Sequence, residues 1–159
     1  MIYMANNDLS TRQAPVDTHA LLDRAQRYCA TAEHCPADVR QLLYRLGATA
    51  GQTDEIIGVL EQQNYLDTAR YCRAFVHDKV TFQNWERIKV QMGLRAKHLP
   101  EGAIQDAIRE MDESAYAANI RKLLRTRHND DRQRLVRFML QRGYTFDDLR
   151  RYAGIDAED

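Results

Sequence analysis

The chain has 159 residues, of which 44% are hydrophobic and 29% are charged, so it can fold and bury a core. The 23 Lys and Arg residues equal the 23 Asp and Glu residues, which argues against a protein whose main task is to coat nucleic acid. No stretch approaches the roughly 18 continuous apolar residues of a membrane span. Residues 1–15 lack the basic and apolar regions of a secretory signal. With three cysteines expected to be reduced, these features predict a cytoplasmic protein with no membrane partner.

Apolar residues recur at spacings of three and four along the chain, without the alternation typical of strands, and predict an all-α fold. The first three predicted helices begin near Asp17, which can serve as an N-cap, at Pro36, and at Thr53. Val39 and Leu43 are expected to face inward from the second of these helices, which ends at Gly47.

A second set of three helices follows. Its predicted helices begin at Asp67, near Asn84, and at Pro100. In the middle helix, Ile88 and Met92 are expected to face inward.

The third predicted set buries Tyr116 and Ile120 from its first helix, and Leu135 and Met139 from its second. Its last helix begins at Thr145-Phe-Asp-Asp148, which has the spacing of a capping box.

Aligning Val39, Ile88 and Leu135 relates the three sets as an internal repeat. The predicted architecture is therefore three tandem three-helix repeats forming an elongated, curved array. Its predicted parts are a disordered leader (1–16), repeat 1 (17–66), repeat 2 (67–111), repeat 3 (112–155) and an acidic tail (156–159).

Two similar octets, RYCATAEH (27–34) and RYCRAFVH (70–77), suggest a duplicated site at first sight. The repeat register does not superpose them, and Cys29 and His34 lie about 140° apart around a helix, which does not suit two ligands of one metal. Phosphate-binding loops and the G-x-S-x-G nucleophile elbow are absent from the sequence. We expect core thiols, no metal, no cofactor and no catalytic residues, and hence a protein that is not an enzyme.

Positive charge gathers in two segments, around Trp85 and over residues 119–142. Such bases can be solvated helix faces, or they can contact an anionic or mixed-charge partner. The candidate partner-binding residues are Arg70, Arg73, Lys79, Arg87, Lys89, Lys97, Arg121, Lys122, Arg125, Arg127, Arg134 and Arg137.

Several stretches resemble the RecX family, regulators of the RecA recombinase. They are EHCPADV (33–39), NYLDTARYCRAFV (64–76), WERIKVQM (85–92) and RGY (142–144), and the resemblance runs from about residue 18 to 152. Cys35 and Pro36 stand where the family usually has Ser-Arg, and Thr68 replaces an Asp. The resemblance implies a modulator that lies in the groove of the RecA–DNA filament and reduces ATP turnover, strand exchange and repressor self-cleavage. We expect the chain to be a monomer.

Two other functions fit the same residues. Three-helix units resemble helix-turn-helix domains in outline, so the chain could be a module that binds single- or double-stranded DNA directly. It could also be a helical-repeat scaffold for a different protein.

Overall fold

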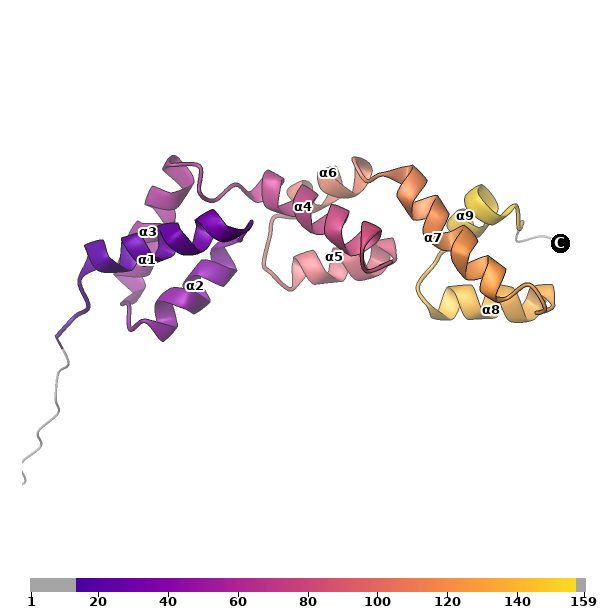
Figure 1. Cartoon of the computed structure of the whole chain (residues 1–159), viewed down its shortest axis with the longest axis horizontal. Coiled ribbons are helices and arrows are strands. Elements are labelled where there is room, and N and C mark those ends of the chain that lie inside the picture. The colour runs from indigo at the N-terminus through magenta and orange to yellow at the C-terminus, as the bar shows by residue number, and fades with distance from the viewer. Residues whose placement is uncertain (1–13, 157–159) are drawn as a thin grey trace, which may run out of the picture.

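The computed structural model describes residues 14–156, and all regular secondary structure in this range is helical. Figure 1 shows the helices as three successive groups along an elongated molecule. We call these groups units 1, 2 and 3. Unit 1 contains α1 (Thr18–Thr31), α2 (Pro36–Arg45) and α3 (Ala50–Gln62); unit 2 contains α4 (Thr68–Thr81), α5 (Arg87–Arg95) and α6 (Glu101–Arg109); unit 3 contains α7 (Glu113–Thr126), α8 (Arg132–Gln141), α9 (Phe146–Asp148) and the π-helical turn η1 (Leu149–Ala153). This arrangement confirms the all-α prediction and fits a three-repeat array.

An aspartate caps the first helix of every unit. Asp17, Asp67 and Asp112 each accept hydrogen bonds from backbone N–H groups in the first turn. Such bonds satisfy donors that have no partner within the helix. The N-caps predicted at Asp17 and Asp67 are confirmed, as is the capping box between Thr145 and Asp148.

The predicted register of unit 2 is wrong. Ile88 and Met92 are 45% and 63% exposed, whereas Val90 and Leu94 are completely buried. Val90 and Leu94 are the fourth and eighth residues of α5, the places that Val39 and Leu43 hold in α2. Leu135 and the fully buried Met139 hold them in α8.

Two predicted helix starts also need correction. Thr53 does not open α3, because Thr49 is the N-cap and forms a capping box with Gln52. Thr53 lies inside the helix and is buried. Helix α5 begins at Arg87 after Glu86, and Asn84 stays outside it with φ at +54°.

A left-handed residue turns the chain after each middle helix. These residues are Gly47, His98 and Gly143, with φ values of +80°, +57° and +102°. Counting eight residues from the anchors Val39, Ile88 and Leu135 aligns Gly47 and Gly143 with Ala96, whereas counting from Val90 aligns them with His98. The shared turn supports the corrected register independently of burial.

The buried apolar residues form two clusters. One cluster lies within unit 1 and includes Leu21, Val39 and Leu60. The other extends through units 2 and 3, and it also takes in Cys35 from the start of α2. Cys35 therefore belongs to the core of the next unit, and the turn between α1 and α2 packs against unit 2.

Polar contacts join the units. Between units 1 and 2, Glu33 pairs with Arg70 at 2.5 Å and Asp38 pairs with Lys97 at 2.6 Å. Between units 2 and 3, Arg87 bridges to Glu113 at 2.9 Å and donates to the Tyr152 hydroxyl at 3.2 Å.

The predicted leader and acidic tail lie mostly outside the described residues. Within residues 14–156, none of the helices is both long and apolar enough to cross a membrane.

Candidate partner-binding surface

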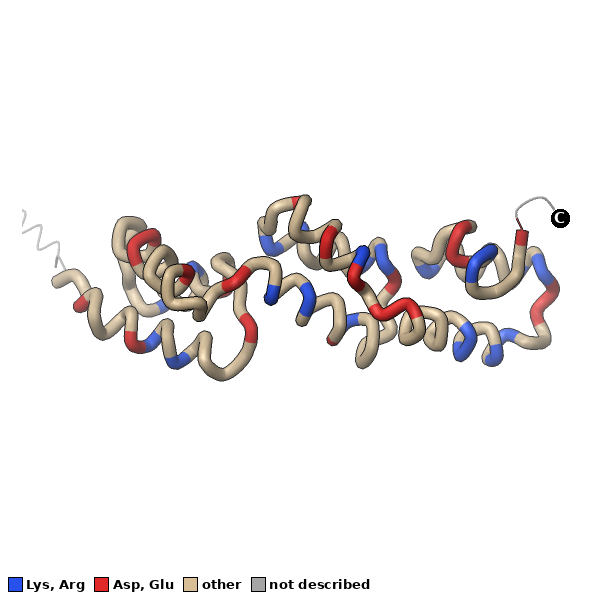
Figure 2. Tube along the Cα trace, turned by 90° about the horizontal axis from the view of Figure 1, so that it is seen from above, with Lys and Arg blue, Asp and Glu red and all other residues tan. Residues whose placement is uncertain are grey.

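Three exposed bases gather on α7. Arg121, Lys122 and Arg125 are spaced so that they lie within about one turn on one side of the helix. None of the three forms an ion pair within the described part of the chain, so their charges are open to a partner. We call them the α7 bases, and Figure 2 shows basic segments along the C-terminal half of this helix.

Two predicted contact residues near α8 have acidic partners within the protein. The Arg127 guanidinium lies 3.8 Å from the centre of the Phe138 ring and pairs with Asp130 at 3.4 Å. Arg134 pairs with Asp131, the N-cap of its own helix, at 3.4 Å. Arg137 is exposed on α8 and has no ion pair among the described residues.

In unit 2, two lysines flank one aromatic ring. The ammonium groups of Lys79 and Lys89 lie 4.7 Å and 4.4 Å from the centre of the Trp85 ring. Trp85 is half-buried and packs edge-on against Phe75. This contact stabilises the lysines through cation–π attraction while leaving Lys89 exposed.

Three further predicted contact residues act between units. Arg70 and Lys97 form the ion pairs that join units 1 and 2, and Arg87 joins units 2 and 3. Arg87 also lies 4.7 Å from the centre of the Tyr116 ring. The guanidinium groups of Arg70 and Arg87 are therefore already engaged within the protein.

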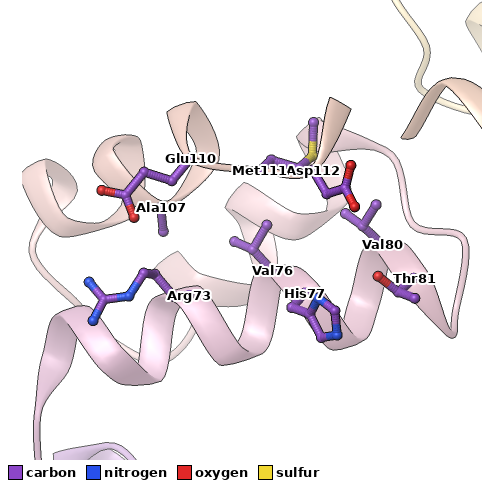
Figure 3. Close-up of a pocket in the computed structure, with 9 residues that line it drawn as sticks. All are labelled: Arg73, Val76, His77, Val80, Thr81, Ala107, Glu110, Met111 and Asp112. Atoms are coloured by element: carbon purple, nitrogen blue, oxygen red, sulfur yellow. The ribbon is translucent and has the colours of Figure 1, made fainter. Parts of the chain in front are cut away.

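The remaining predicted base, Arg73, borders a groove of about 230 Å³ between α4 and the end of α6. Figure 3 shows Val76 and Val80 of α4 facing the α6 side, with the side chains of Arg73, His77 and Thr81 along the same helix. Because Glu110 and Asp112 also line the groove, its charges are mixed. A groove with both acidic and basic residues has no clear preference for an anion, whereas the α7 bases present positive charge alone.

The thiols lie in apolar surroundings. Cys29, Cys35 and Cys72 are all buried and free. Burial raises the pKa of Cys29 to about 11 and also raises the pKa values of Cys35 and Cys72. A thiol with a raised pKa is a poor nucleophile at neutral pH. The described residues contain no group of three or more side chains suited to a metal ion.

Sequence reasoning left Asn84, Asn119 and Arg142 out of the candidate site. These residues line one pocket of about 150 Å³ between units 2 and 3, together with Lys122 of α7. No local sequence signal marks this pocket, because it joins residues that are distant in the chain.

The chain is similar to proteins named "Regulatory protein RecX". The relative from Prosthecochloris aestuarii is 26% identical over 138 residues, covering 84% of this chain and 91% of the relative. The relative from Thermus thermophilus is 31% identical over 102 residues, covering 63% of this chain and 68% of the relative. The crystal structure of RecX from Lactobacillus salivarius matches with a TM-score of 0.74 at 14% identity, covering 86% of this chain and 94% of that one.

No protein-family model matches the chain. The relatives nevertheless cover most of it, and one exceeds 30% identity over two thirds of its own length. The solved structure has the same fold. The chain belongs to the RecX family of regulatory proteins.

Proposed function

We propose that this protein is a non-enzymatic regulator that binds the RecA–DNA filament and inhibits its recombinase and coprotease activities. Family membership indicates a regulator. The observation that carries the proposal further is the exposure of the α7 bases, Arg121, Lys122 and Arg125, which form no ion pair within residues 14–156. A protein–DNA filament presents carboxylates and phosphates, and both attract such a surface.

The elongated shape supports a large partner. Units in a row expose an extended surface, in the way that helical-repeat proteins do. Ion pairs at both junctions hold the units together, so the surface is ordered before binding. An ordered surface loses less conformational entropy when a partner binds.

The test measures ATP hydrolysis by RecA assembled on single-stranded DNA. Adding the intact chain at a stoichiometric amount should lower the turnover. The double variant Arg121→Glu/Arg125→Glu should lose most of this effect, because its reversed charges repel the same partner. The matched control is Arg24→Glu/Arg45→Glu, which reverses two exposed bases of unit 1, on α1 and α2, that have no ion pair among the described residues.

Unchanged turnover with the wild-type chain would contradict the proposal. Direct DNA binding is distinguished by salt, because the affinity of a module held by phosphates falls steeply as salt rises. We expect the chain to remain on the filament at a salt concentration that releases it from bare duplex DNA.

A further inference from the structure

A small polar pocket lies where unit 2 meets unit 3. Asn84 comes from the turn before α5, Asn119 and Lys122 come from α7, and Arg142 and Tyr144 follow α8. Its volume of about 150 Å³ suits the end of one side chain rather than a large ligand. The pocket wall is already ordered, because the Asn119 side-chain amide donates to the Val80 carbonyl oxygen at 2.8 Å.

The pocket is positively charged. Lys122 and Arg142 contribute two cations, whereas none of the lining residues is acidic. Glu86 beside it is buried and lies 3.9 Å from Nε of Arg142. Asp148 is also buried, and it accepts hydrogen bonds from the Tyr116 hydroxyl and the Thr145 backbone N–H. Within the described residues no carboxylate pairs with Lys122, so the pocket lining favours an added negative group.

The junction between units 1 and 2 contains a pocket in the corresponding place. Lys97 lines it and immediately precedes the left-handed His98, as Arg142 precedes the left-handed Gly143. Glu33 also lines it and stands three residues before α2.

Asn84 stands three residues before α5, the place that Glu33 holds before α2. The first junction therefore contains carboxylates of its own: Glu33, which pairs with Arg70 at 2.5 Å, and Asp78, which also lines the pocket. The second junction has a neutral amide there and retains two cations.

We propose that the pocket between units 2 and 3 binds an aspartate or glutamate side chain of a protein partner, on the side that corresponds to Glu33 at the first junction. This inference rests on the proposed function and names the chemistry of one contact within it. The Arg142 guanidinium matches a planar carboxylate, and Lys122 adds a second charged donor. Leu123 lines the same pocket and can contact the methylene groups of the acidic side chain.

The experiment titrates the full-length, ¹⁵N-labelled chain with a capped tetraglutamate peptide while recording the side-chain amide signals of Asn84 and Asn119. Parallel titrations use inorganic phosphate and tetrathymidylate. The peptide should shift both amide signals at a lower concentration than either phosphate compound.

Two variants localise the effect. Lys122→Gln removes an exposed cation and should weaken peptide binding about tenfold, the loss expected for one charge-assisted contact. Asn84→Asp supplies an internal carboxylate at a left-handed position that aspartate tolerates, and should weaken peptide binding at least as much. Arg24→Gln, on α1, should bind the peptide as the wild type does.

Several results would overturn the inference. They are unshifted Asn84 and Asn119 signals, tighter binding of phosphate or tetrathymidylate at these amides, and wild-type peptide binding by Asn84→Asp.

The ATP-turnover assay separates this inference from the proposed function. If the wild type and both pocket variants inhibit the filament equally, the pocket assignment fails and the function stands. If the wild type binds the peptide but leaves turnover unchanged, the function fails and the pocket stands.

Discussion

Lys97 donates a hydrogen bond to Asp38 over 2.6 Å and thereby joins the end of α5 to the start of α2. Asp38 also accepts from the backbone N–H and the thiol of Cys35, which lies in the core of the second unit. One carboxylate therefore caps a helix and connects two units.

We expect Asp38→Asn to lower the free energy of unfolding by about 1–2 kcal/mol at pH 7, because a partly buried charged hydrogen bond is lost. Burial by itself would raise the pKa of Asp38, but the Lys97 and Cys35 hydrogen bonds outweigh it and hold the pKa below its ordinary value. The stabilisation is therefore complete above the unfolded pKa of about 3.9 and is lost as pH falls through the lower, folded pKa. Urea unfolding of both proteins between pH 7 and pH 3 measures the difference.

The control for this experiment is Asp106→Asn, which removes an exposed ion pair with Arg109 on the same helix. It should change stability little at any of these pH values. A gap between wild type and Asp38→Asn that stays constant down to pH 3 would contradict the ion-pair explanation.

The corrected register of α5 predicts opposite results for two neighbouring substitutions. Leu94→Ala should destabilise the chain by about 2–5 kcal/mol, because Leu94 is completely buried. Met92→Ala should change stability by less than about 0.5 kcal/mol, because Met92 is 63% exposed. Thermal or urea unfolding measures both changes in stability. If Met92→Ala destabilised the chain more than Leu94→Ala, the register expected from the sequence would be correct instead.

The misplacement of α5 shows where sequence reasoning stops. Ile88 and Met92 have helical spacing, but so do Val90 and Leu94, and both pairs are apolar. Choosing between them requires the helix start, and Glu86 gives no side-chain capping bond that would mark it. By contrast, Asp17 and Asp67 mark their helix starts by local chemistry, and these two starts were predicted correctly.

The sequence predicts which residues of the candidate site are positively charged, but not which of them are paired with acids in the fold. The positive residues are evident in the sequence, yet the ion pairs that join the units are not local. Arg70 and Glu33 are 37 residues apart, and Lys97 and Asp38 are 59 apart. Only the fold separates such bases from Arg121 and Arg125, which have no acidic partner among the described residues.

The three thiols should resist modification in the folded protein. Their raised pKa values leave little thiolate at pH 8, and burial blocks access to reagents. A chromogenic disulfide reagent added in excess should react slowly without denaturant and rapidly with all three thiols in guanidinium chloride. Immediate release of one equivalent from the native chain would show that one of the cysteines is accessible.

Substitution of Arg70 should separate structural bases from partner-binding ones. The guanidinium of Arg70 pairs with Glu33 and donates to the Asn64 carbonyl oxygen at 2.9 Å. Arg70→Ala should therefore lower the free energy of unfolding by about 1–3 kcal/mol, since it leaves these acceptors unsatisfied. Arg125→Ala, at an exposed position, should change it by less than about 0.5 kcal/mol.

The two substitutions should have the opposite ranking in their effect on filament inhibition. At a temperature where both variants are folded, Arg70→Ala should inhibit RecA ATP turnover as the wild type does, whereas Arg125→Ala should inhibit it less. The double variant Glu33→Gln/Arg70→Ala should recover part of the stability lost by Arg70→Ala, because it removes the charge that was left unpaired. If Arg70→Ala kept full stability and lost inhibition, Arg70 would contact the partner directly and its ion pair with Glu33 would open on binding.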